Sequence, residues 1–184
     1  RRPGGEHVVS PIAYTEQRDH RCHAVVVPAE IEPEVEQKAK EVAIAAVEAV
    51  DGVGMNAVEL FHDPDRGILV NEIAPRPHNT GHYSIEGSYT SQFENHLRAV
   101  LDWPLGSPEL RAPNACMVNI LGQRQGEPRT DGLTEALEIP GVSVHIYGKS
   151  EVRPNRKMGH VTATGSDREL IRRRAEEAAG LIQL

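Results

Sequence analysis

The polar run VNEIAPRPHNTGHYS, at residues 70–84, has the composition of a ligand-binding site. It places one glutamate, one arginine, two histidines and two asparagines beside two prolines. Carboxylate oxygens bind hard divalent cations, and the planar fork of arginine matches carboxylate or phosphate. Asparagine both donates and accepts hydrogen bonds, and histidine can donate while it stays near neutral charge. The run predicts a site for a small oxyanion or, alternatively, a polar loop fixed by its own hydrogen bonds.

Two prolines in this run are expected to order the polar side chains between them. Pro75 and Pro77 hold the main chain extended, because each ring fixes its own backbone angle. Arg76, His78 and Asn79 are therefore presented beyond the end of the preceding strand.

A β-hairpin is predicted to position the acidic part of the site. Strands at 54–62 and 67–73 are separated by DPDR, whose Pro64 suits the second position of a type I turn. In the register that a four-residue loop gives, Glu59 lies opposite Val70.

In this register Glu72 is the diagonal neighbour of Glu59 on the same face, about 7–8 Å away at Cα. Two glutamates at that spacing can converge on one hard cation, which predicts a magnesium site. The alternative is a solvated face on which both carboxylates are ordinary surface groups. Asn56 and Asn71 point to the other face unless a bulge intervenes.

The remaining sequence predicts a mixed α and β fold with antiparallel strands. Apolar runs bounded by glycine and proline predict strands, and apolar residues at helical spacing predict helices. Strands are expected at 6–14, 23–29, 116–122, 142–148 and 159–165, and helices at 33–52, at 91–103 and from Ser166 onward. The first two strands are expected to form a hairpin with TEQRDHR as its loop.

Capping patterns mark the starts of two of these helices. Ser91-x-x-Glu94 and Ser166-x-x-Glu169 both fit the capping box. The helix at 91–103 carries an apolar face that is expected to pack against another element; it consists of Phe93, Leu97, Val100 and Leu101.

A proline-rich stretch, WPLGSPELRAP, predicts a domain boundary between 104 and 113. Residues 1–104 are expected to form an α/β lobe with an antiparallel sheet. Residues 113–184 are expected to form a small β-rich domain that ends in a helix.

Composition excludes several classes of function. The chain of 184 residues carries 20 lysines and arginines against 27 aspartates and glutamates, a net charge of −7. This balance argues against general binding to nucleic acid or to anionic membranes, and no apolar run approaches the ~20 residues of a membrane span. Two cysteines are too few for a disulfide framework, which favours a reducing compartment. The opening RRPGGEHVV lacks an initiator methionine and a signal peptide, and is typical of a chain entered midway.

Other histidines are expected to have supporting roles or none. His20, Cys22 and His23 could ligate zinc or copper, but neighbouring strand residues alternate sides, so we expect Cys22 inward and both histidines solvated. His96 is expected on a helix surface. His82 and His160 are expected to support the site without touching substrate.

The run NEIAPRPHNTGHYS, followed by TSQFENHLRAV and PLG, resembles the carboxy-terminal half of the N5-carboxyaminoimidazole ribonucleotide synthases, which are ATP-grasp enzymes of purine synthesis. Further matches are AVELF at Glu59, NACMVNILG at 114–122 and YGKSEVRPNRKMGHVT at 147–162. A related ATP-grasp formyltransferase of the same pathway carries a similar EVSPRPHDTG run, but it lacks the GHYS continuation and the RKMGH pattern.

The resemblance implies a fold and a set of acidic roles. The fold is an ATP-grasp carboxy-terminal lobe followed by a small β-rich carboxy-terminal domain. Glu59 and Glu72 match magnesium-binding glutamates, and Asn71 matches the asparagine that joins Glu72 at the phosphates of ATP.

It also implies catalytic and substrate-binding residues. Arg76, His78 and Asn79 match the stretch where bicarbonate, carboxyphosphate and aminoimidazole ribonucleotide meet. Lys149 and Arg156 match the basic pair that helps to hold the phosphate of the ribonucleotide. Solvated surface charge is the alternative for this basic loop, which also includes Arg153 and Lys157.

The implied activity is ATP-dependent and magnesium-dependent carboxylation of 5-aminoimidazole ribonucleotide with bicarbonate, in a cytoplasmic homodimer. The chain resembles only about the last half of such enzymes and is expected to be inactive alone. Thr15 and Gln17 also stand where the family often has an Asn-x-His pair. The alternatives are a non-catalytic binding or assembly module that kept the fold, and the related formyltransferase.

Overall fold

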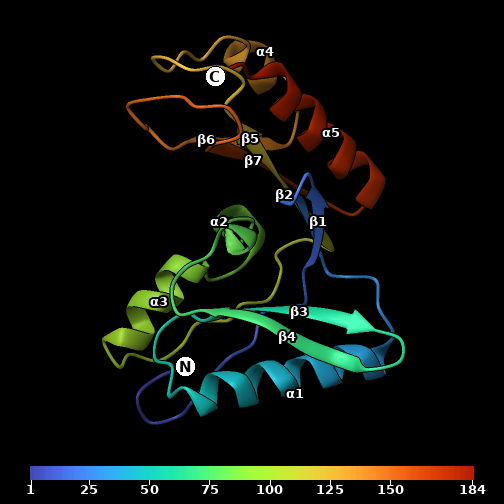
Figure 1. Ribbon diagram of the computed structural model, residues 1–184, viewed down its shortest axis with the longest axis vertical. Helices are drawn as coiled ribbons and strands as arrows, with labels where there is room; N and C mark the ends of the chain where they lie inside the picture. The colour runs from blue at the N-terminus through green and yellow to red at the C-terminus, as the bar shows by residue number, and fades with distance from the viewer. The chain divides into compact units, whose positions relative to one another are not determined.

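The computed structural model describes residues 1–184, which divide into two compact units (Figure 1). The first unit consists of Arg1–Ile12 and Ala29–Glu109, and the second of Ala13–Pro28 and Leu110–Leu184. None of the helices has the length and apolar character that a membrane crossing requires.

The first unit is built on a two-stranded sheet with a helix along it. Helix α1 (Pro33–Ala49) packs against strands β3 (Ala57–Asp63) and β4 (Gly67–Ala74), as Figure 1 shows. Pro33 stands in the first turn of α1, where a missing N–H costs nothing. The predicted helix and the predicted hairpin are both present.

Short helical elements follow the hairpin. They are the 3₁₀ turn η1 (Asn79–Gly81), α2 (Ser84–Gly87) and α3 (Gln92–Val100). The predicted cap of α3 is confirmed, because the hydroxyl of Ser91 accepts a hydrogen bond from the backbone N–H of Glu94 at 3.2 Å.

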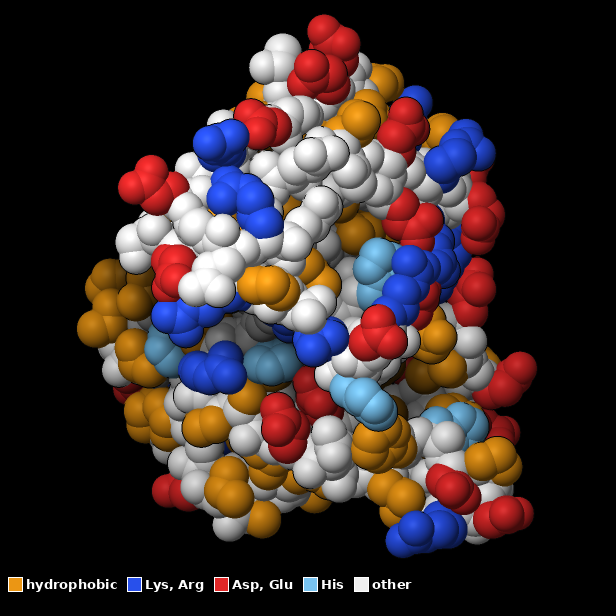
Figure 2. All heavy atoms as spheres, turned by 45° about the horizontal axis from the view of Figure 1, so that its top comes forward, with side chains coloured by type: hydrophobic (Ala, Val, Ile, Leu, Met, Phe, Trp, Pro, Cys, Tyr) orange, Lys and Arg blue, Asp and Glu red, His pale blue; other side chains and the backbone are white.

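The apolar face of α3 is exposed, although the sequence pattern predicted that it packs. Leu97 is 58% exposed and Leu101 53%, and the following Trp103 is 58% exposed. Elsewhere, acidic and basic side chains are interspersed on the face drawn in Figure 2, so the surplus negative charge does not form one acidic patch there.

The second unit is a five-stranded antiparallel sheet in the order β1-β2-β5-β7-β6. Two helices, α4 and α5, accompany it (Figure 1). The bounds are β1 Tyr14–Arg18, β2 Arg21–Val27, β5 Asn114–Leu121, α4 Leu133–Leu137, β6 Val142–Ile146, β7 Lys157–Gly165 and α5 Arg168–Leu181.

The first hairpin differs from its predicted form. Residues 15–18, predicted as loop, belong to β1, because the turn needs only Asp19 and His20, both with positive φ (49° and 60°). Such a turn matches the twist of the two strands that it joins. Strand β2 then pairs with β5, so Ala13–Pro28 lies in the second unit, whereas the proline-rich stretch predicts that all of 1–104 forms one lobe.

Helix α5 closes the core of the second unit. Its buried residues Ile171, Ala175 and Ala178 recur every three or four positions and pack against one face of the sheet. The helix begins after Asp167, whose carboxylate accepts a hydrogen bond from the N–H of Leu170 at 2.9 Å. The cap is therefore one residue beyond the predicted Ser166, since aspartate caps as well as serine does.

Candidate functional site

The hairpin β3–β4 places its two glutamates directly opposite each other. The predicted register, with Glu59 opposite Val70, is wrong: Leu60 pairs with Val70, and Glu59 pairs with Glu72. A β-bulge between Glu59 and Leu60 leaves Asn71 as the extra residue of β4. The bulge brings the two carboxylates closer than diagonal neighbours would be.

The turn of this hairpin explains part of the shift. The side chain of Asp63 accepts hydrogen bonds from the backbone N–H groups of Asp65 (3.0 Å) and Arg66 (2.8 Å). This local pairing keeps Asp63 in β3 opposite Gly67, so the loop has three residues rather than four.

A third potential ligand joins the two carboxylates. Ligand atoms of Glu59, Glu72 and His78 all lie within 4.8 Å of one another. The Nε2 atom of His78 lies 3.9 Å from a carboxylate oxygen of Glu59. The amide of Asn71 donates to the other oxygen of Glu59 at 3.2 Å, so the bulge turns Asn71 toward the carboxylates. The position of His78 in this cluster was not predicted from the sequence.

This cluster, which we call the Glu59–Glu72–His78 cluster, fits a divalent cation in its chemistry. Two carboxylates that face each other repel unless a positive charge lies between them. Carboxylate oxygens are the ligands that magnesium prefers, and magnesium completes its shell with waters and substrate phosphates. Glu72 is exposed and Glu59 partly buried, which leaves room for such additional ligands.

Gln92 holds the loop that carries His78. Its amide accepts from the backbone N–H of His78 (2.9 Å) and donates to the carbonyl of His78 (2.8 Å). The same amide nitrogen lies 2.9 Å from Nδ1 of His82. His82 therefore supports the loop indirectly, by holding the amide of Gln92. A Cβ atom on Gly81 would lie 2.4 Å from the side-chain carbonyl oxygen of Gln92, so a larger residue there would displace the Gln92 amide from these hydrogen bonds.

Sequence reasoning missed Gln92, because a glutamine at the start of a helix is typical of a helix surface. In the structure it is only 4% exposed. The sequence feature that could have indicated its burial is its position between the predicted cap at Ser91 and the apolar Phe93.

Arg76 and Asn79, both predicted site residues, flank His78 in the chain. The guanidinium of Arg76 is exposed and donates to the carbonyl of Pro77 at 3.1 Å. Asn79 opens the turn η1, and its carbonyl accepts from the N–H of His82 at 3.1 Å. Arg76 therefore remains available to a ligand, while the backbone of Asn79 is part of the turn.

The predicted phosphate-binding residues lie in the second unit, in the loop between β6 and β7. Lys149 donates to the carbonyl of Lys157, and Arg156 donates to the carbonyl of Glu151 at 2.8 Å. Burial, with the positive charges of Arg156 and Lys157, holds the pKa of Lys149 below its usual value. Arg153 forms an ion pair with Glu151 at 2.7 Å. In these hydrogen bonds Lys149 and Arg156 each donate to a backbone carbonyl, whereas Arg153 is paired with a carboxylate.

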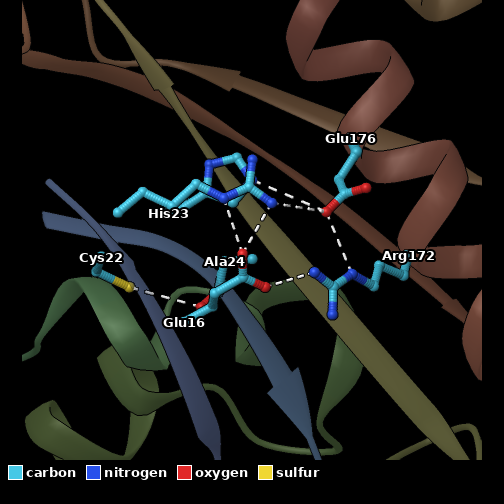
Figure 3. A network of polar contacts seen from close by, with 7 residues as sticks. Glu16, Cys22, His23, Ala24, Arg172 and Glu176 are labelled. Atoms are coloured by element: carbon cyan, nitrogen blue, oxygen red, sulfur yellow. Dashed lines mark hydrogen bonds and ion pairs between the residues drawn. The ribbon is translucent and has the colours of Figure 1, made fainter.

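The first hairpin carries another group of polar residues (Figure 3). Cys22 is buried, as predicted, whereas His23, predicted to be solvated, is partly buried. A bulge in the pairing with β1 turns His23 toward α5, and its Nε2 lies 3.8 Å from Glu176. Burial and the nearby charge of Arg18 lower the pKa of His23.

His96 also differs from its predicted position on a helix surface. Its Nδ1 accepts a hydrogen bond from the backbone N–H of Met55 at 3.0 Å. Gly54, with φ of 92°, gives the ring room, because a Cβ atom there would lie 2.9 Å from Nδ1. His96 thus links α3 to the segment that leads into β3, the strand that carries Glu59.

Comparison with known proteins matches both units. The sequence model of the ATP-grasp domain matches residues 1–93, and the model of the phosphoribosylaminoimidazole carboxylase C-terminal domain matches residues 115–174. The N5-carboxyaminoimidazole ribonucleotide synthase of Mycobacterium tuberculosis is 44% identical over 97% of this chain and 42% of its own length. The phosphoribosylaminoimidazole carboxylase of Schizosaccharomyces pombe is 43% identical over 89% of this chain and 31% of its own.

Solved structures agree with these matches. The N5-carboxyaminoimidazole ribonucleotide synthetase of Thermotoga maritima superposes with a TM-score of 0.89 at 46% identity, over 100% of this chain and 50% of that one. A synthase of Aspergillus clavatus in complex with ADP and 5-aminoimidazole ribonucleotide gives 0.83 at 39% identity, over 93% and 46%.

These matches confirm the predicted family and fold class, while the chain spans no more than about half the length of the relatives described. The residues of the Glu59–Glu72–His78 cluster fall within the matched ATP-grasp segment, and Lys149 and Arg156 fall within the matched C-terminal domain. The chain therefore belongs to the ATP-grasp family and carries the C-terminal domain of the phosphoribosylaminoimidazole carboxylases.

Proposed function

We propose that this chain supplies the metal-binding and substrate-phosphate-binding residues of an ATP-dependent ligase that carboxylates 5-aminoimidazole ribonucleotide with bicarbonate. The observation that carries the proposal is the direct opposition of Glu59 and Glu72 beside His78. Solved relatives from Thermotoga maritima and Staphylococcus aureus, 46% and 36% identical, are both named as N5-carboxyaminoimidazole synthetases, with or without the ribonucleotide in the name, which supports the choice of reaction.

Glu59 and Glu72 would hold magnesium, with Asn71 beside them at the phosphates of ATP. Magnesium supplies neutralisation of phosphate charge during phosphoryl transfer. The chain's own contribution is to hold both carboxylates on one face of a hairpin and to fix Glu59 through the amide of Asn71.

Arg76, His78 and Asn79 would act on bicarbonate and on its activated form. Transfer of the terminal phosphoryl group of ATP to a bicarbonate oxygen gives carboxyphosphate and ADP. The exocyclic amine of the ribonucleotide then forms a bond to the carboxyl carbon, the bond from that carbon to the phosphate oxygen breaks, and the departing inorganic phosphate takes up the proton that the amine loses. The exposed guanidinium of Arg76 is suited to stabilise negative charge on the carboxyl oxygens. The backbone of His78, held on both sides by Gln92, keeps its imidazole near the carboxylates.

Lys149 and Arg156 would bind the phosphate of the ribonucleotide. Their positive charges act on each other through a partly buried loop, and a phosphate would relieve that repulsion. This assignment is independent of the metal cluster, because it concerns the other unit of the chain.

We also propose a cytoplasmic homodimer. The exposed apolar side chains on and after α3 support an interface, since contiguous exposed apolar residues mark association surfaces. Light scattering on the wild type and on Leu97→Glu tests the association. A monomeric wild type, or a variant that stays dimeric, would argue against this surface.

The test of the reaction uses the natural full-length chain that contains these residues. ADP release should require both bicarbonate and 5-aminoimidazole ribonucleotide, and it should fall below detection in Glu59→Gln. Asp65→Asn removes an exposed carboxylate from the turn of the same hairpin and should leave the rate unchanged. ADP release with formate in place of bicarbonate would indicate the related formyltransferase instead. No release with any substrate set would indicate a binding or assembly module.

A further inference from the structure

The ammonium group of Lys149 is held over an aromatic ring. It lies 5.6 Å from the centroid of the Tyr147 ring, within the range of cation–π attraction. Gly148, with φ of 64°, turns the chain back between the two residues, a conformation that glycine adopts without strain. The carbonyl of Lys157 accepts a hydrogen bond from the same ammonium group. A ring and a carbonyl thus both hold the end of a side chain that is otherwise flexible.

The Tyr147 ring is itself fixed from the core. Its hydroxyl lies 2.9 Å from Nδ1 of His160, which is 1% exposed. The His160 ring stacks on His145 with centroids 4.5 Å apart and planes 16° apart. These two histidines are direct partners across β6 and β7, so the stack follows from the strand register.

Close strand approach at this point depends on one glycine. A Cβ atom on Gly159 would lie 2.3 Å from the carbonyl oxygen of His145. The sheet register therefore determines where His160 lies, His160 orients Tyr147, and Tyr147 supports Lys149.

We propose that Tyr147, oriented by His160, is a positioning residue that holds Lys149 ready for the phosphate group of the ribonucleotide substrate. This inference rests on the proposed function, in which Lys149 binds that phosphate. Lysine is a compact point charge on a long flexible stem, so a preorganised ammonium group binds phosphate more tightly than a mobile one. If Tyr147 positions Lys149 in this way, its replacement should raise KM for the ribonucleotide and have little effect on kcat.

The test measures kcat and KM for 5-aminoimidazole ribonucleotide in the natural full-length chain. Lys149→Met should raise KM about 10- to 100-fold, the range expected when a hydrogen bond to a charged group is lost. Tyr147→Leu should raise KM about fivefold by removing the ring, and Tyr147→Phe about twofold by freeing it from His160. In all three, kcat should change by less than about twofold. Tyr14→Leu, at a tyrosine that is 52% exposed in the same unit, is the matched control and should change neither constant.

A double-mutant cycle separates positioning from general support of the fold. Once Lys149→Met is present, Tyr147→Leu should raise KM no further, because there is no ammonium group left to position. If Tyr147→Leu lowers the melting temperature of the second unit, the cycle is run with Tyr147→Phe instead. Tyr147→Phe should likewise raise KM no further once Lys149→Met is present.

The outcomes distinguish the positioning role of Tyr147 from the phosphate-binding role of Lys149. An unchanged KM in Lys149→Met overturns the phosphate-binding assignment, and the positioning role with it. A raised KM in Lys149→Met with wild-type constants in both Tyr147 variants overturns the positioning role alone. Equal effects of Tyr147→Leu with and without Lys149 also overturn it, because the ring would then act independently of the lysine.

Discussion

Replacement of Glu72 by glutamine should stabilise the ligand-free protein while it removes metal binding. Ligand atoms of Glu59 and Glu72 lie within 4.8 Å of each other. At that separation two like charges repel by about 1 kcal/mol in bulk water and by about 3.5 kcal/mol at an effective dielectric constant of 20. Glu72 is exposed, so the lower value applies. Relief of this repulsion should therefore raise the free energy of unfolding by about 1 kcal/mol.

The opposite effect is expected once the cation is present. A neutral amide is a weaker ligand for magnesium than a carboxylate, and cation affinity depends on the charge of the ligand set. Affinity for magnesium in the presence of ADP should therefore fall by at least roughly tenfold. A single substitution should raise stability without ligand and abolish most of the stabilisation by ligand.

Two measurements check this pair of effects on the natural full-length chain. Thermal unfolding without metal should show a melting temperature about 1–2 °C higher in Glu72→Gln, because the shift per kcal/mol falls as chain length grows. Isothermal titration with magnesium and ADP should show the weakened binding. Asp65→Asn, in the turn of the same hairpin, should change neither result because its side chain lies outside the cluster. A lower melting temperature, or wild-type affinity for magnesium and ADP, would refute the account of a strained carboxylate pair.

Two further predictions concern the stability of the second unit. Burial raises the pKa of Glu16, but neighbouring arginines, including Arg172, outweigh it and hold this pKa below its ordinary 4.5. A carboxyl with a depressed pKa stabilises the fold above its unfolded pKa and loses that contribution as pH falls through the folded value. Arg172→Met should therefore lower the melting temperature at pH 7, and the melting temperature of this variant should fall less than that of the wild type as pH drops below 4.5. The same pH dependence in both proteins would contradict this prediction. Gly159→Ala should destabilise by about 1–3 kcal/mol because its Cβ would meet the carbonyl of His145. Gly180→Ala in α5, where a Cβ meets nothing within 4 Å, should stabilise in the same melting assay; equal effects of the two would contradict the packing argument.

Elements with strong local signals could be predicted from the sequence. Pro33 removes an unpaired N–H from the first turn of α1, and the hydroxyl of Ser91 accepts a hydrogen bond from an N–H in the first turn of α3. No distant part of the chain is needed to recognise either signal. The cap of α5 was misplaced by one residue because Ser166 and Asp167 are both good caps and only the backbone conformation distinguishes them.

The acidic site was predicted in kind but not in geometry. Period-two alternation suggested that Glu59 and Glu72 share a face, and they do lie opposite each other. The bulge at Asn71 could not be read from the pattern, because it depends on a balance between the turn at Asp63 and the pairing beyond it. The bulge turns the side chain of Asn71 to the face of the hairpin that carries the glutamates. Asn71, expected on the opposite face, therefore donates a hydrogen bond to Glu59.

The pairing of β2 with a distant strand could not be predicted from local sequence patterns, although one feature of the sequence indicated that a further strand was needed. The run Ala24–Val27 is apolar without alternation, and its four residues are between 0% and 2% exposed. A continuous apolar run is typical of a strand that is covered on both faces and paired on both edges. A two-stranded hairpin with β1 leaves one edge of β2 unpaired, so the pattern required a further strand. That strand is β5, which begins at Asn114, and such distant pairing is not encoded in any short window of sequence. The first hairpin thus folds with residues that follow it by almost a hundred positions. A single boundary at the proline-rich stretch therefore assigns this hairpin to the first unit, although it belongs to the second.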